Sequence, residues 1–513
     1  MTALAVVPLP QSVTETGESW RLDSDVTIPA TGPDGLVAPV AELLETYLRG
    51  AGVNVRRTSQ TGASGIRIVL THNGSGDESY RLTTGSAGCV IAAGSPAGVG
   101  HGIQTLRQLL PAVWLDAAAP RGTAEVPGVV IEDAPAYEWR GALLDPARHI
   151  IPVEHVRRFI DAMALHRLNR LHFHLTDDQG WRLPVPSRPR LTGVGARRAQ
   201  SQRSLDKSDL DGTPHAGAYT RAELTDLVAC AEARGIVIVP EIDLPGHTTA
   251  ALAAYPELGN TDVSGPHGVS CVWGVHDTVL NLDPATLGFC EDVLAETLAI
   301  FPSPWIHIGG DECPTTEWER SAAARARCRA FGIEGVELAQ AFVTTRLTDW
   351  LRERGRRAVV WDEAADDDLA RDVIVMAWRH RRFGLGAAAR GNDVVMTPSD
   401  ATYFDCYQSD AAGEPPAQPG VTTLATAYGY APRPAEAPRE VRERIIGAQG
   451  ALWGEYLPTT ERLDDMAFPR LSAVEERAWR EQPTTNADFS HRARVQLERL
   501  AVLGIRGRTL PGA

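Results

Sequence analysis

Two adjacent acids give the sequence its clearest chemical signal. Asp311 and Glu312 follow Gly309 and Gly310 at the end of a short apolar run. Neighbouring residues of a regular strand point to opposite faces, but glycines allow the backbone to leave that pleat. We therefore expect both carboxylates to converge on one ligand. Two neighbouring carboxyls that differ in protonation state can act as an acid and as an ion stabiliser in one reaction.

Other apolar runs end in a similar mixture of polar and aromatic residues. The side chains that follow these runs include Arg148, His174, Asp177, His247, Trp361, Trp378, Trp453 and Glu455. Carboxylates and arginines hydrogen-bond hydroxyl groups, and tryptophan rings pack on the apolar face of a sugar. A phosphate site would instead need glycine-rich turns or lysine clusters at helix N-termini. The mixture therefore favours a carbohydrate substrate.

The elements that must position these residues alternate regularly after Trp139. Eight apolar runs are separated by amphipathic helical segments, and they span residues 141–145, 171–175, 236–241, 305–309, 358–361, 373–377, 393–396 and 448–453. This alternation predicts an α/β fold, a (β/α)8 TIM barrel with helices such as 153–168 and 336–351. The alternative is an open doubly wound sheet, which would carry a glycine-rich turn after its first strand. The first run ends in Leu144-Asp145-Pro146 instead.

The first part of the chain has a different pattern. It contains β-rich runs and two helical segments, at residues 65–71, 89–93, 37–50 and 98–110. We predict a small α+β domain over residues 1–135, followed by the barrel with C-terminal helices over 136–513. A segment rich in Ala, Pro and Gly, residues 116–127, is the predicted junction.

Composition excludes several classes of protein. With 43% apolar and 22% charged residues the chain of 513 residues is not disordered, and its net charge of −15 indicates neither nucleic acid nor an anionic membrane as partner. No apolar run approaches the roughly 20 residues of a membrane span. The start has no basic residue before Arg21 and no obvious cleavage site, so we expect a cytoplasmic protein, with secretion as the alternative. Seven cysteines fit reduced thiols, although Cys271 and Cys290 could pair.

Taken together, these motifs resemble glycoside hydrolase family 20, the β-N-acetylhexosaminidases. The resemblance covers nearly the whole chain and rests on stretches at 144–149, 172–178, 240–247, 307–312, 361–363 and 453–455. It implies an exo-acting enzyme that removes terminal non-reducing GlcNAc or GalNAc with retained configuration. It implies no metal and no cofactor. It decides neither the preferred epimer nor the oligomeric state.

The resemblance also implies a mechanism in which the 2-acetamido group of the substrate attacks the anomeric carbon and forms an oxazolinium intermediate. Glu312 would be the general acid and then the base, while Asp311 would stay ionised and hold the acetamido N–H. Tyr403 would hold the acetamido carbonyl. Asp177 and His247 match a relay behind the acid, with His174 near them.

The remaining matches concern the sugar ring. Trp361, Trp378 and Trp453 match the walls of the acetamido pocket, Arg148 the residue that binds the C3 and C4 hydroxyls, Glu455 the one at C4, and Asp405 the one near C6. One departure concerns the leaving-group side, because no Trp occurs between Trp378 and Trp453, where family members commonly have one.

Two alternatives remain at this point. A barrel hydrolase could bind a metal through His172, His174 and His247, since HxH pairs are metal ligands in some barrels. A sugar-binding protein without activity is the second alternative, which the intact set of Asp311, Glu312 and Tyr403 disfavours.

Overall fold

A closed barrel of eight parallel strands forms the larger part of the computed structural model, which describes residues 4–58, 65–71, 76–116 and 122–510. The strands in chain order are β8 (Trp139–Leu144), β9 (Arg170–His174), β14 (Val237–Glu241), β15 (Trp305–His307), β16 (Arg357–Trp361), β17 (Ile374–Ala377), β18 (Val394–Met396) and β21 (Ile445–Leu452). Each of the eight predicted runs contributes one strand. The predicted TIM barrel is thus confirmed.

The barrel strands form because their side chains are buried on both faces. All six residues of β8 are buried, as expected for a parallel strand that is covered by helices. The covering helices include α3 (Val153–Leu165), α5 (Arg221–Glu232), α7 (Pro284–Leu298), α10 (Ala339–Arg352), α11 (Arg381–Arg390), α16 (Arg470–Trp479) and α17 (Asn486–Val502). The two helices predicted by residue range correspond to α3 and, after one 3₁₀ turn at Val336–Leu338, to α10.

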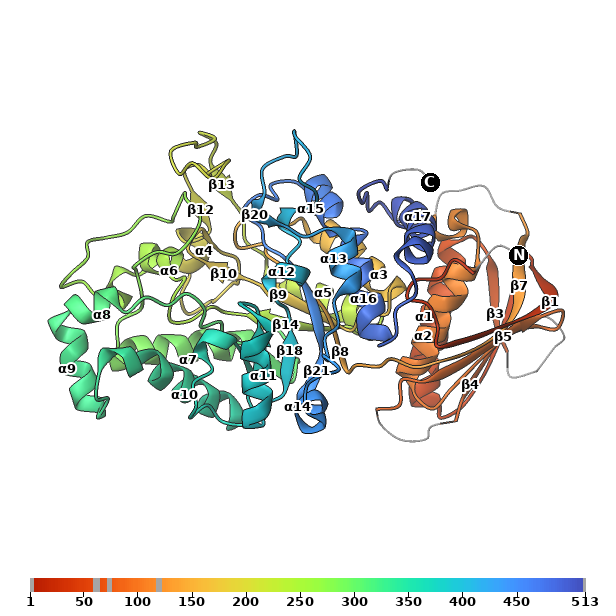
Figure 1. Ribbon diagram of the computed structural model, residues 1–513, viewed down its shortest axis with the longest axis horizontal. Coiled ribbons are helices and arrows are strands. Elements are labelled where there is room, and N and C mark those ends of the chain that lie inside the picture. The colour runs from red at the N-terminus through yellow and green to blue at the C-terminus, as the bar shows by residue number, and fades with distance from the viewer. Residues whose placement is uncertain (1–3, 59–64, 72–75, 117–121, 511–513) are drawn as a thin grey trace.

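The N-terminal part is a seven-stranded mixed sheet with two helices packed on it, which confirms the predicted α+β domain (Figure 1). Its strands are β1 (Ser12–Leu22), β2 (Asp25–Thr31), β3 (Asn54–Thr58), β4 (Gly65–Leu70), β5 (Tyr80–Gly85), β6 (Gly88–Ala93) and β7 (Ala124–Asp133). The helices are α1 (Asp34–Gly50) and α2 (Pro96–Leu109). In Figure 1 this domain lies at the right, beside the barrel.

The predicted junction at 116–127 is wrong in its C-terminal part. Residues 124–127 begin β7, which pairs antiparallel with β1 and with β5 inside the sheet. Burial explains the strand, because Val126, Val129 and Ile131 are fully buried while Glu125 and Glu132 are exposed. Residues 117–121 lie outside the described residues. The chain passes into the barrel between the end of β7 and Trp139.

One barrel side chain belongs to the core of the N-terminal domain. Trp479, the last residue of α16, is fully buried in the same apolar cluster as the sheet residues. Its Nε1 donates to Asp133 Oδ1 at 2.9 Å, and the guanidinium groups of Arg140 and Arg167 lie 5.2 and 4.8 Å from its ring centre. The two domains therefore share part of one core.

Two further features bear on the sequence predictions. Cys271 and Cys290 are both free thiols, so the pairing considered above does not form. In the described part of the chain, no helix combines the length and the apolar character that crossing a membrane requires. The cytoplasmic location stays a prediction.

Candidate active site

A cavity of about 300 Å³ opens at the carboxyl ends of the barrel strands. Eight of the predicted site residues line it, namely Arg148, Asp311, Glu312, Trp378, Tyr403, Asp405, Trp453 and Glu455. The structure adds Gly274, Ser399, Cys406, Gln418 and Pro419, which sequence reasoning missed. These five lie in the segments that follow the strands, where periodicity carries little signal. Barrel enzymes place their active sites at this end of the strands.

The acid pair reaches the cavity because the backbone leaves the strand after β15. Gly309, Gly310 and Glu312 have φ angles of 67°, 95° and 45°, all in the left-handed region. A Cβ on Gly309 would lie 1.8 Å from Asp243 Oδ1, so only glycine fits there. Both acids consequently line the same cavity, as the glycine pair predicted.

His247 stands directly behind the acid pair. Its Nε2 is 3.5 Å from Glu312 Oε2 and 3.9 Å from Asp311 Oδ2. Burial opposes protonation of the ring, but the nearby carboxylates of Asp177 and Glu312 and the hydrogen bond to Asp178 hold the pKa of His247 well above its usual range. The ring faces both catalytic candidates, and its surroundings favour the protonated form.

The structure gives His247 a carboxylate partner that the sequence analysis did not name. His247 Nδ1 lies 3.0 Å from Asp178 Oδ2 and 3.5 Å from Asp177 Oδ1. Asp178 Oδ1 also accepts from the backbone N–H and the hydroxyl of Thr249, at 2.9 and 2.5 Å. The sequence placed two adjacent Asp residues here, and residue type alone could not decide which one contacts the ring.

Asp177 has other principal partners. Arg148 Nη2 lies 2.7 Å and His174 Nε2 2.9 Å from its Oδ2. His174 Nδ1 in turn hydrogen-bonds Glu241, so His174 lies behind the cavity and does not line it. Asp177 and His174 therefore hold Arg148 in place, while Asp178 holds His247.

The aromatic residues divide into a wall and a layer behind it. The rings of Trp378 and Tyr403 are nearly parallel, with centres 6.0 Å apart, and Tyr403 meets Trp453 at 58° and 6.1 Å. Trp361 does not line the cavity. It is fully buried, its Nε1 donates to Glu241 Oε1 at 2.8 Å, and its ring centre lies 5.7 Å from that of Trp453. Trp361 thus supports the wall from inside the barrel.

The cavity also carries hydroxyl-binding groups with free oxygen atoms. Asp405 Oδ1 and Glu455 Oε2 are buried, and neither atom has a hydrogen-bond partner among the described residues. Burial, and then the charge of Glu455, raises the pKa of Asp405 well above its usual range, and burial raises that of Glu455. Arg148 is fixed by Asp145, with Nη1 2.9 Å from Oδ2, and by Gln179. Such groups suit the hydroxyls of a sugar.

The segment without a Trp also reaches the cavity. Strand β19 (Cys406–Tyr407) pairs with β20 (Gln418–Val421), and the chain between them forms a loop. Gln418 and Pro419 line the cavity, and Gln418 Nε2 donates to Glu455 Oε1 at 3.3 Å. An amide and a proline therefore stand on this side of the cavity.

The structure does not bring the alternative metal ligands together. Among the described residues, no two of His172, His174 and His247 occur in one group of neighbouring ligand atoms, although the groups of His174 and His247 share Asp177 and Asp243. His172 and His307 lie with Glu241, whose Oε1 also accepts from Trp361. Trp361 Nε1 and His174 Nδ1 hydrogen-bond the two oxygens of that carboxylate. The arrangement suits a hydrogen-bonded barrel interior better than a three-histidine metal site.

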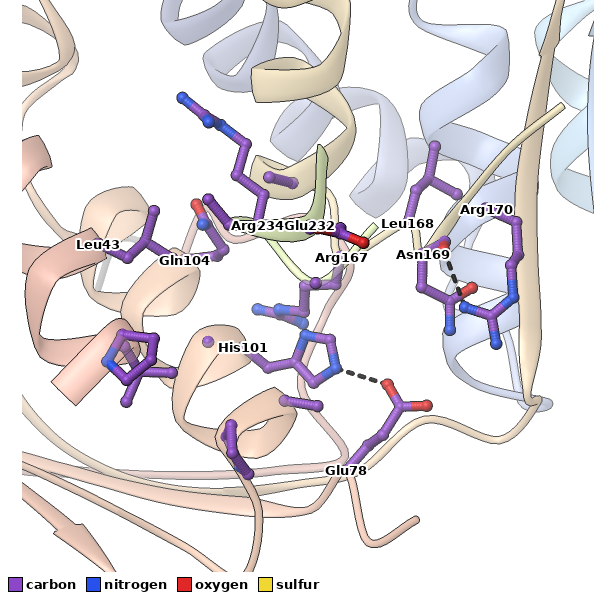
Figure 2. Close-up of a pocket in the computed structure, with 18 of the residues that line it drawn as sticks. Leu43, Glu78, His101, Gln104, Arg167, Leu168, Asn169, Arg170, Glu232 and Arg234 are labelled. Carbon is purple, nitrogen blue, oxygen red and sulfur yellow. Dashed lines mark hydrogen bonds and ion pairs between the residues drawn. The ribbon is translucent and has the colours of Figure 1, made fainter. Parts of the chain in front are cut away.

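A second cavity, of about 380 Å³, lies between the N-terminal domain and the barrel (Figure 2). One acid of its lining is paired, since Glu78 Oε2 lies 2.7 Å from His101 Nε2 and 2.6 Å from Arg140 Nη2. Its described lining contains neither Trp nor Tyr. Of these two cavities, the first is the one that gathers the polar and aromatic groups expected for a sugar site.

Comparison with known proteins agrees with this geometry. The model for glycosyl hydrolase family 20, catalytic domain, matches residues 137–482, and that for glycosyl hydrolase family 20, domain 2, matches residues 3–134. A beta-hexosaminidase of Porphyromonas gingivalis is 37% identical over 491 residues, covering 94% of this chain and 61% of that protein. This chain therefore spans less than two thirds of that relative's length.

Two solved structures are similar over nearly the whole chain. The family 20 exo β-N-acetylglucosaminidase of Vibrio harveyi, in complex with N-acetylglucosamine, has a TM-score of 0.86 at 32% identity and covers 99% of this chain and 79% of its own. The family 20 β-N-acetylhexosaminidase of Streptomyces coelicolor has a TM-score of 0.84 at 32% identity, covering 100% and 98%.

Proposed function

Because the chain belongs to glycosyl hydrolase family 20, we propose that it is an exo-acting β-N-acetylhexosaminidase that releases terminal GlcNAc or GalNAc with retained configuration. The observation that carries the proposal is the acid pair Asp311 and Glu312 beside the His247 ring, in a cavity with a Trp and Tyr wall. The substrate class is a carbohydrate with a 2-acetamido group.

The acetamido group would lie against the aromatic wall. Burial raises the pKa of Tyr403 well above its usual range, so its hydroxyl stays protonated and can donate to the acetamido carbonyl. Asp311, with 13% of its side chain exposed, would accept from the acetamido N–H. Held between these two groups, the carbonyl oxygen can attack the anomeric carbon. A well-oriented intramolecular attack of this kind can lower the activation barrier by about 7 to 11 kcal/mol.

Glu312 would supply and later remove the proton. It is the more open member of the pair, with 35% of its side chain exposed. An acid on the open side can protonate the departing glycosidic oxygen and then activate the water that replaces it. Asp311 would meanwhile balance the positive charge of the oxazolinium intermediate, which a water-poor pocket makes effective.

Fixed polar groups in the cavity support exo action. Arg148, Asp405 and Glu455 line it, and Arg148 is held by Asp145, Asp177 and Gln179. Where such groups bind the hydroxyls of the terminal ring, they leave no path for further sugars beyond it. The enzyme would therefore take only a terminal residue.

The test is a panel of aryl 2-acetamido sugars and short chitooligosaccharides, with the product anomer followed by NMR. Retention is expected, and the matching 2-hydroxy sugars should be cleaved far more slowly because they cannot assist. A thiazoline analogue of the cyclised intermediate should bind much more tightly than the free sugar. Uncleaved substrates would favour a sugar-binding protein, and a glycosyl ester on a side chain would overturn the mechanism.

The proposal requires neither metal nor cofactor. Treatment with EDTA should leave turnover unchanged. Loss of activity that zinc restores would instead support the metal-dependent alternative.

A further inference from the structure

Asp243 is a buried acid with a role that the mechanism above does not assign. It follows β14 and is 1% exposed. Its Oδ1 accepts from the backbone N–H of Gly310 at 3.0 Å, and its own N–H donates to Thr176 Oγ1 at 3.1 Å. The missing Cβ of Gly309 makes room for this carboxyl. The side chain is thus fixed against the turn that carries the acid pair.

The carboxyl group of Asp243 also faces Asp311. Single ligand atoms of Asp243, Asp311 and His247 all lie within 4.8 Å of one another, so the two carboxyls are close neighbours. Asp243 Oδ2 and Asp311 Oδ1 are buried, and neither has a donor partner among the described residues. Two ionised carboxyls only accept hydrogen bonds, so a bond between them requires a proton.

We propose that Asp243 carries this proton in the resting enzyme and donates its O–H to Asp311 as a positioning residue. The proposal rests on the proposed function, in which Asp311 holds the acetamido group. Asp243 touches no substrate in this scheme. Asp243 instead fixes the rotation of the Asp311 carboxylate about its Cβ–Cγ bond. Asp311 Oδ2 then stays in its position 3.9 Å from His247 Nε2.

The surroundings place the proton on Asp243 rather than on Asp311. Burial, and then the charges of Asp311 and Glu241, raises the pKa of Asp243 well above its usual range, against the opposing effect of His247 and His174. The nearby Cys313 thiol is itself kept neutral by burial, which raises its pKa. Burial and the two neighbouring acids therefore outweigh the two imidazoles and favour a neutral Asp243.

Asp311 has the better environment for the remaining charge. Burial and the charges of Glu241 and Glu312 raise its pKa as well, but the charge of His247 opposes this rise, and a hydrogen bond from Asp243 would also favour the ionised form. Two coupled carboxyls with different partners share one proton unequally. A carboxylic acid kept neutral in this way serves as a hydrogen-bond donor at neutral pH.

The test compares two substitutions of Asp243 in the full chain. Asp243→Asn keeps an acceptor for Gly310 and a donor for Asp311, so kcat on an aryl 2-acetamido glycoside should fall by less than about fivefold. Asp243→Val removes the donor and should lower kcat about 100-fold, the effect of one lost preorganised hydrogen bond. The infrared difference spectrum of the wild type minus Asp243→Asn should contain the carbonyl band of a protonated carboxylic acid at neutral pH.

Each arm can overturn the inference. If Asp243→Asn loses as much activity as Asp243→Val, Asp243 acts as a carboxylate and not as a hydrogen-bond donor. Should the Val variant fail to fold, a loss of about 100-fold in Asp243→Asn leads to the same conclusion. Absence of the acid band at neutral pH would equally overturn the assignment of the proton. Cleavage by the wild-type protein tests the proposed function separately, so the two failures are distinguishable.

Discussion

His247 Nε2 lies 3.5 Å from Glu312 Oε2, while Nδ1 of the same ring lies 3.0 Å from Asp178. Both residues of the first contact have left-handed backbone angles, φ 49° for His247 and φ 45° for Glu312. Non-glycine residues adopt that region at a cost, and they do so mainly where the surrounding structure fixes them. The contact between the His247 ring and the Glu312 carboxyl is therefore held by the backbone of two separate loops.

Replacing Glu312 by Gln should separate proton transfer from binding. We expect turnover of substrates with poor leaving groups to fall by a factor of about 10² to 10⁴, the usual contribution of a general acid. Sugar binding, measured by calorimetry, should stay close to that of the wild type because the hydroxyl-binding groups are unchanged. Equal turnover of the variant on such substrates would reassign the acid.

Asp178→Asn and Asp177→Asn should have different effects. Both substitutions lower the pKa of His247, Asp178→Asn by weakening a hydrogen bond and Asp177→Asn by removing a nearby charge, so the alkaline limb of kcat/KM should move to lower pH in each. Loss of the Asp177 charge also frees Arg148, whose Nη2 lies 2.7 Å from that carboxylate, so KM should rise. Complete pH profiles of both variants would decide this, and identical profiles would contradict the division of roles.

Glu475 predicts a pH-dependent stability. Both of its carboxyl oxygens are buried without a hydrogen-bond partner among the described residues, and burial raises its pKa well above the usual range. When the pKa of a carboxyl is raised on folding, its contribution to the free energy of unfolding is complete below the unfolded pKa of about 4.3. As the pH rises from there towards the folded pKa, only the unfolded chain ionises, and this contribution is lost. Glu475→Met should therefore raise the free energy of unfolding at pH 8 by more than about 1 kcal/mol and flatten its pH dependence.

The neighbouring Glu476 provides the matched control for this measurement. Its two oxygens accept from Arg492, with Nη1 at 2.5 Å and Nη2 at 2.7 Å. Glu476→Gln would leave Arg492 with Asp488, 3.0 Å away, as its remaining acidic partner, so the variant should destabilise the protein by up to about 3 to 5 kcal/mol, the cost of breaking a buried ion pair. Urea unfolding of both variants at pH 5 and pH 8 checks the pair. Glu475→Met with an unchanged pH dependence would show that Glu475 is not neutral in the fold.

Lys207 offers a chemical test of the cavity's position. It is the only lysine in the sequence, and its Nζ lies 3.7 Å from the point where a Cβ on the cavity residue Gly274 would be. A bulky amine-reactive acyl group on this side chain should obstruct the opening and lower kcat/KM at least severalfold. The product sugar should slow the labelling, and Lys207→Ala should resist inactivation. Full activity of protein labelled at Lys207 would place the opening elsewhere.

The fold could be predicted because its signals are local. Each barrel strand is a short apolar run with turn or polar residues after it, and Gly309 and Gly310 mark the place where the chain leaves β15. The error at the junction has an equally local cause. Ala, Pro and Gly near residue 124 indicate a loop by composition, whereas the pairing of β7 with β1 and β5 depends on residues far away in the sequence.

The site could be predicted in its members but not in all of its contacts. Asp311, Glu312, Tyr403 and Trp453 line one cavity, as their motifs suggested. The sequence could not show that His247 lies closer to Asp178 than to Asp177, because two adjacent acids differ only in their direction. Nor could it show that Trp361 packs behind the cavity wall, since that depends on how β16 sits in the closed barrel.

The position of Trp479 limits how this chain can be divided. The indole that ends α16 fills space inside the other domain, where it hydrogen-bonds Asp133 on β7. A barrel produced without the first 135 residues would present this ring and its two flanking guanidinium groups to water. Such a fragment would be prone to aggregate, and the intact chain should melt in a single cooperative transition. The N-terminal sheet is accordingly part of the folding unit that keeps the catalytic barrel intact.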